Sequence, residues 1–151
     1  MPGPDPDPVP VPVLFDHERL DVYRAAIDFV RRTRDIVDSI ANSREHSRSG
    51  AYLIDQLQRA ASSIVLNIAE GAGEFSPGDK ARFYRMALRS ATECAAVLDV
   101  AKATSGLPIL GVDDGRAILA RIVAMLTRMV AVQKEQRTDR DRERDRDRDR
   151  T

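Results

Sequence analysis

Apolar side chains recur at three- and four-residue steps through almost the whole middle of this chain, residues 13–136. That period places apolar residues along one side of an α-helix. The alternating apolar and polar pattern of half-buried strands is absent, and clusters of β-branched residues are short. The sequence therefore predicts an all-α protein. A stretch of roughly 120 residues is enough for one compact core and too short for two domains.

Breaks in the pattern divide this stretch into four helical segments of about 22 to 27 residues each, or roughly 33 to 40 Å. The third has the clearest start, with a serine N-cap, proline at the first helical position and an acid at the third (residues 76–79). Short connections between segments of matched length predict an up-down-up-down four-helix bundle. The alternative is a pair of long hairpins that become stable only on association. The expected segments begin at about Asp16, Ala51, Ser76 and Asp113, and their ends lie at or just before Asn42, Gly71, Gly106 and Gln136.

The inner faces follow from the same period. Ile64 and Ile68 are expected at the buried centre of the second segment. The inner face of the third segment is rich in alanine and serine, which permits a close approach between helices. It is expected to comprise Phe83, Met86, Ala87, Ser90, Ala91, Cys94, Val97, Leu98 and Ala101.

Both ends of the chain are unfit for a core. Residues 1–13 carry proline at every second position, which predicts an extended, disordered arm. The tail, residues 137–151, is almost entirely arginine and acidic residues, and without apolar side chains it cannot pack. It is expected either to extend the last helix or to be disordered. The domain is therefore expected to span residues 14–136.

Composition excludes several function classes. The 24 basic residues balance 24 acidic ones, so nucleic-acid contact would have to come from a local patch. A single cysteine, Cys94, excludes an internal disulfide and a cysteine-based zinc site. His17 and His46 lack the Glu-x-x-His spacing of a di-metal bundle, so no metal or cofactor is expected. No apolar run approaches the roughly 18 residues of a membrane span, and a cytoplasmic location is the expectation.

The most specific stretch of the chain is residues 53–76. Ten of its residues match a "Q-x-x-R-A-x-x-S-I-x-x-N-I-A-E-G" helix: Gln56, Arg59, Ala60, Ser63, Ile64, Asn67, Ile68, Ala69, Glu70 and Gly71. This helix resembles the signature of the bacterial four-helix bundle family, also called the 23S rRNA intervening-sequence protein family. Residues 20–25 resemble its "L-x-V-W-x-x-A" opening, with Tyr23 where Trp is usual. Residues 83–93 resemble "F-x-x-x-A-x-G-S-x-x-E", with Arg89 where Gly is usual.

The resemblance spans about residues 14–132 and implies a four-helix protomer. Characterised relatives form a homopentameric barrel with a basic surface. A related protein, the accessory variability determinant of diversity-generating retroelements, binds a reverse transcriptase and nucleic acid. The resemblance therefore implies a homo-oligomer, with RNA or DNA and a reverse transcriptase as candidate partners. It identifies no reaction.

Five polar residues form a stripe on the second segment, within about 80° of one another around the helix. They could form hydrogen bonds and ion pairs across a helix or subunit boundary, hold a ligand, or activate a water. The structural or interface interpretation is favoured. The stripe comprises Gln56, Arg59, Ser63, Asn67 and Glu70.

Arg82, Arg85 and Arg89 lie within about 60° around the third segment, preceded by Lys80. Arginine binds phosphate bidentately, so this basic stripe suits the backbone of RNA or DNA. A solvated charged face is the alternative. The sequence thus predicts a non-catalytic oligomeric module that binds nucleic acid or a nucleic-acid enzyme. The alternative function is a structural scaffold that binds only protein.

Overall fold

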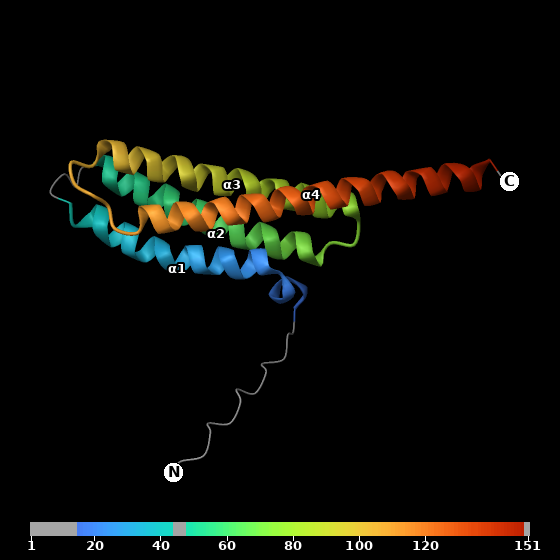
Figure 1. Cartoon of the computed structure of the whole chain (residues 1–151), viewed down its shortest axis with the longest axis horizontal. Coiled ribbons are helices and arrows are strands. Elements are labelled where there is room, and N and C mark those ends of the chain that lie inside the picture. The colour runs from blue at the N-terminus through green and yellow to red at the C-terminus, as the bar shows by residue number, and fades with distance from the viewer. Residues whose placement is uncertain (1–14, 44–47, 150–151) are drawn as a thin grey trace, which may run out of the picture.

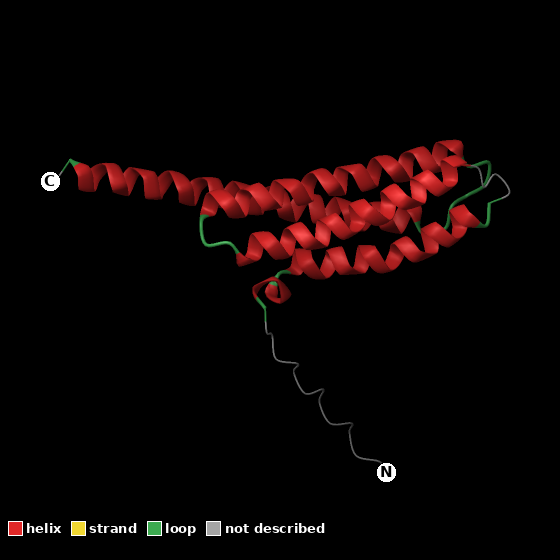
Figure 2. Cartoon of the chain, turned by 180° about the vertical axis from the view of Figure 1, so that it is seen from behind, coloured by secondary structure: helices red, strands yellow, loops and turns green. Residues whose placement is uncertain are grey.

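The computed structural model describes residues 15–43 and 48–149. The proline-rich arm at residues 1–13 lies outside the described residues, so the expectation for it stays a prediction. The described chain forms four long helices and a short 3-10 turn, and it contains no strand (Figure 2).

The helices form an up-down-up-down bundle in which each helix packs against two neighbours (Figure 1). Helix α1 packs against α2 and α4, and α3 packs against the same two helices. The predicted all-α four-helix bundle is confirmed. The elements in chain order are the 3-10 turn η1 (Asp16–Arg19), α1 (Asp21–Ala41), α2 (Arg48–Gly73), α3 (Pro77–Thr104) and α4 (Val112–Arg148).

Local signals explain most helix starts. The Ser76 hydroxyl accepts the Asp79 backbone N–H at 3.1 Å, and Pro77 is the first residue of α3, as predicted. The start of α1 differs from the prediction, because Asp16 opens a separate turn and α1 begins only after Leu20. The Glu18 carboxylate accepts the Phe15 backbone N–H at 3.1 Å, which stabilises that turn.

The core is a single cluster contributed by all four helices. Ile64 and Ile68 are fully buried at its centre, as the periodicity of α2 predicted. The predicted inner face of α3 is wrong at two residues, since Met86 is 44% exposed and Phe83 is only half-buried. Tyr84, which was not predicted there, is buried. The reason is helix rotation, since the buried line of α3 passes through Tyr84, Ala87, Ala91, Cys94 and Leu98.

Helix α4 continues well beyond the end of the other three helices (Figure 1). The sequence left two alternatives for the tail, a helix or disorder. The structure is helical at residues 137–148, so the disordered alternative is wrong for them. Ion pairs of opposite charge join successive turns there. Arg137 Nε lies 3.9 Å from Asp141, and Arg142 Nη1 lies 3.6 Å from Asp139. All side chains of this stretch are exposed. We call residues 137–148 the extension.

We expect Ile64→Ala to lower the free energy of unfolding by about 2 to 5 kcal/mol, because it leaves a cavity in a closely packed core. Chemical denaturation followed by circular dichroism measures the change. Leu110→Ala is the matched control, since Leu110 is 75% exposed in a loop and loses the same atoms. Equal stability of the two variants would contradict the placement of α2.

Candidate functional site

Part of the predicted polar stripe forms a hydrogen-bonded chain between α2 and α3. The Asn67 amide donates to the Ser63 hydroxyl at 3.0 Å and to the Ser63 carbonyl at 2.8 Å. The hydroxyls of Ser63 and Ser90 lie 2.8 Å apart, and Ser90 donates to the Met86 carbonyl at 3.1 Å. Because the Ser90 proton is used there, Ser63 is the donor in the contact between the two serines. Ser63 thus joins α2 to α3, and Asn67 supports Ser63 from the next turn of α2.

The rest of the stripe faces solvent. Arg59 donates from Nε to Asp55 at 3.1 Å, one turn earlier on the same helix, and its side chain is 76% exposed. Glu70 is also exposed and forms no ion pair with any residue in the described part of the chain. Gln56 is half-buried. The hollow that Arg59 and Asn67 line does not include Glu70, the carboxylate of the predicted stripe.

A shallow hollow of about 510 Å³ runs along the outer side of α2, beside the exposed part of the stripe. Leu66, which is 63% exposed, lies in this hollow, and Tyr52 is equally exposed near the start of α2. Sequence periodicity did not place Leu66 or Tyr52 on the inner face of α2. It also did not predict that the two side chains would form exposed apolar surface. The residues lining the hollow are Asp55, Gln58, Arg59, Ser62, Ser63, Leu66 and Asn67.

The glycine at the end of the motif marks a close approach of α2 to α3. A Cβ atom on Gly71 would lie 2.6 Å from Tyr84 Cε1 and 3.1 Å from Phe83 Cβ. The separation from the Tyr84 ring is shorter than carbon atoms tolerate, and the one from Phe83 is tight, so only glycine fits without displacing the Tyr84 ring. Gly71 is therefore a packing residue, and it lets the Tyr84 side chain enter the core.

The predicted basic stripe lies on the outer face of α3. Arg82, Arg85 and Arg89 are all exposed, and none forms an ion pair with the described residues. The Arg82 guanidinium lies over the Phe83 ring, 4.7 Å from its centroid. This stacking holds the guanidinium by cation–π attraction and leaves its outer N–H groups directed to solvent.

Lys80 has a different position from the three arginines. Its ammonium group donates to the Ala72 carbonyl at 3.0 Å and to the Gly71 carbonyl at 3.4 Å. These carbonyls belong to the last turn of α2, where a helix leaves backbone acceptors unpaired and favours positive charge. Lys80 thus caps α2 from the first turn of α3, a role that sequence spacing did not indicate.

No reactive centre stands out among the described residues. Burial raises the pKa of the Cys94 thiol to about 12, with Glu93 adding repulsion, so the thiol stays protonated near neutral pH. Burial also raises the pKa of Tyr84. Residues 15–43 and 48–149 contain no group of three or more metal-ligating side chains. Within the same residues, no helix is both long and apolar enough to cross a bilayer.

Comparison with known proteins agrees with this geometry. A family model described as "23S rRNA-intervening sequence protein" matches residues 18–128, which leaves the end of α4 outside the match. A similar solved structure is the crystal structure of a protein of unknown function from the S23 ribosomal protein family of Bacteroides thetaiotaomicron. It has a TM-score of 0.61 and 19% identity, and the match covers 72% of this chain and 97% of that chain. At this identity the likeness shows the fold alone. No curated protein matches the chain.

We expect Gly71→Ala to destabilise the fold by about 1 to 3 kcal/mol, because the new methyl group overlaps the Tyr84 ring. Gly73→Ala, two residues later in the same helix, is the control, since a Cβ there meets nothing within 4 Å. It should be neutral or stabilising by up to about 1 kcal/mol. Thermal melts of both variants test the pair, and similar melting temperatures would contradict the close approach.

Proposed function

The chain belongs to the 23S rRNA-intervening sequence protein family, and we propose that it is a non-catalytic, oligomeric four-helix module that binds nucleic acid. The single observation that carries the proposal is the outer face of α3. Three arginines there point to solvent with no carboxylate partner among the described residues. Their charge is therefore available to phosphate groups.

Three other exposed arginines differ from this set. Arg24, Arg31 and Arg116 each lie against a carboxylate, which neutralises part of their charge. An arginine that already holds a carboxylate must give it up before it binds phosphate. The stripe of Arg82, Arg85 and Arg89 needs no such exchange, and its spacing along one helix face suits a run of backbone phosphates.

Exposed apolar side chains on α2 support self-association. Leu66 and Tyr52 expose nearly two thirds of their surface beside the polar stripe. Apolar surface of this kind, rimmed by polar groups, is typical of protein contacts. We propose that this face of α2 contacts another copy of the chain, with a homopentamer as the state that the family resemblance implies. The basic stripe would then be repeated on each protomer, which raises avidity for a long polyanion.

The same apolar face supports the second candidate function, a scaffold that binds only protein. A reverse transcriptase partner rests on the family resemblance alone. Binding of generic RNA that weakens with added salt would favour the nucleic-acid module over the scaffold.

We expect replacement of Arg82, Arg85 and Arg89 by glutamine to weaken RNA or DNA binding and to reduce its salt dependence, because three phosphate contacts are lost. Fluorescence anisotropy at several salt concentrations measures both effects. The control removes the same charge elsewhere, through Arg31→Gln, Arg121→Gln and Arg128→Gln, all exposed on α1 or α4. If both triple variants lose affinity equally, net charge and not the α3 face governs binding.

For the oligomer, light scattering at micromolar concentration should give a mass well above the 16.8 kDa of one chain. Leu66→Asp should shift the mass toward a monomer, because it places a charge in the contact, and should leave the helical content intact. A monomer at every concentration of the native protein would disprove self-association.

A further inference from the structure

The extension of α4 carries a line of arginines in the direction of the bundle core. At 100° per residue, four of its arginines lie within about 40° of the direction of Leu126, which is fully buried. They take the positions that follow Val130 and the half-buried Gln133 along the core-facing side of α4. The apolar line of α4 thus turns into a basic line where the other helices end. The four residues are Arg137, Arg140, Arg144 and Arg148.

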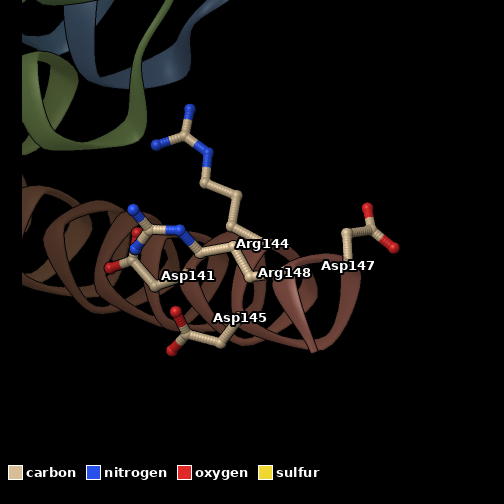
Figure 3. Close-up of a pocket in the computed structure, with 5 residues that line it drawn as sticks. All are labelled: Asp141, Arg144, Asp145, Asp147 and Arg148. Carbon is tan, nitrogen blue, oxygen red and sulfur yellow. The ribbon is translucent and has the colours of Figure 1, made fainter. Parts of the chain in front are cut away.

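The close-up of the extension shows how two of these side chains lie. Arg144 stands off the helix axis, while the guanidinium of Arg148 lies toward the Asp141 carboxylate in this view (Figure 3). Both arginines line a shallow, exposed hollow of about 640 Å³ on the extension. Arg144 is exposed, and the structure gives it no ion pair with the described residues.

Three of the four arginines of the basic line repeat at four-residue spacing. Arg140 and Arg144 are four residues apart, as are Arg144 and Arg148, and like charges at this spacing destabilise a helix. The five acidic residues of the extension offset part of that repulsion, as the pair of Arg137 and Asp141 shows. A run of negative groups along the basic line would relieve it, and successive arginines lie about 5 to 6 Å apart, close enough to follow a continuous polyanion.

Acidic residues lie on both sides of the basic line. Asp141 lies about 60° to one side of the basic line, and Glu143 and Asp147 lie to the other side. They would repel the second strand of a duplex. A single strand needs only one line of phosphate contacts, so the flanking acids favour it.

An aromatic side chain is available at the same end of the bundle. Phe75 lies in the connection between α2 and α3 and is 95% exposed. Figures 1 and 2 both place this connection at the end of the bundle from which the extension emerges. Unpaired bases stack on exposed aromatic rings, whereas paired bases cannot.

We infer that the extension and Phe75 form a binding track for single-stranded nucleic acid, with Arg140 and Arg144 on the phosphates and Phe75 against a base. The inference rests on the proposed function for the chemistry of the ligand. It adds a second site, which is separate from the α3 stripe and whose arginines lie outside the residues that the family model matches. It also specifies that the nucleic acid bound there is single-stranded.

The test compares two double variants of the full chain by anisotropy with a labelled 20-nucleotide oligothymidine. Arg140→Gln with Arg144→Gln should weaken binding about tenfold or more, because two phosphate contacts are lost. Arg142→Gln with Arg146→Gln is the matched control: it removes the same charge at the same spacing, about 140° to 180° around the helix. The control should change affinity less than about twofold. Equal losses would overturn the inference.

A second comparison addresses the strand. Phe75→Leu should weaken binding of the oligothymidine about fivefold or more and leave the affinity for a 20-base-pair duplex unchanged, since only unpaired bases stack. A duplex that binds the native protein as tightly as the single strand would overturn the inference. So would an unchanged affinity of Phe75→Leu for the single strand.

The α3 triple variant, measured in the same titration, separates the two proposals. If it loses binding while the Arg140 and Arg144 variant does not, the proposed function holds and the track is wrong. If only the extension variant loses binding, the track holds and the α3 surface is wrong. A native protein that binds neither strand form overturns both.

Discussion

The close contact between α2 and α3 is the constraint on which the rest of the structure depends. Small residues line this contact, and Gly71 lies so near the Tyr84 ring that a single methyl group would not fit. Farther along, the Ser63 and Ser90 hydroxyls meet at 2.8 Å with Asn67 completing the chain of hydrogen bonds. Short side chains and satisfied hydroxyls allow two backbones to approach without burying an unpaired polar group.

That contact also fixes how α3 is rotated, and the rotation determines what solvent meets. With Tyr84 and Cys94 turned inward, Arg82, Arg85 and Arg89 are turned outward. The same rotation buries the Cys94 thiol, whose raised pKa keeps it protonated near neutral pH. Charged surface, and not an enclosed reactive pocket, is what the described part of the molecule offers to a partner.

Helix α4 continues as a regular helix beyond the end of the bundle core. As far as Val130 the core-facing positions are apolar and buried. Beyond Gln133 the same positions are occupied by arginine, with no neighbouring helix to cover them. A helix that leaves the bundle in this way presents its charges in fixed directions, which a disordered tail of the same composition would not.

Sequence alone determined the four helices, the capped start of α3 and the buried centre of α2, because periodicity and caps act between residues a few positions apart. The family motif could likewise be recognised from its residue types, but the structural role of each motif residue could not be predicted from them. Why Gly71 must be glycine depends on a tyrosine 13 positions later in another helix. The same holds for Lys80, which caps a helix other than its own.

Only the tertiary structure decided the rotation of α3 and the fate of the tail. Periodicity predicted Phe83 on the inner face, whereas the structure buries Tyr84, its neighbour about 100° around the helix. The space left by Gly71 admits Tyr84. For the tail, the sequence left helix and disorder equally open, because its local charge pairs are balanced. Continuation from a helix already nucleated and held in the bundle removes the cost of starting one, and so the extension is helical.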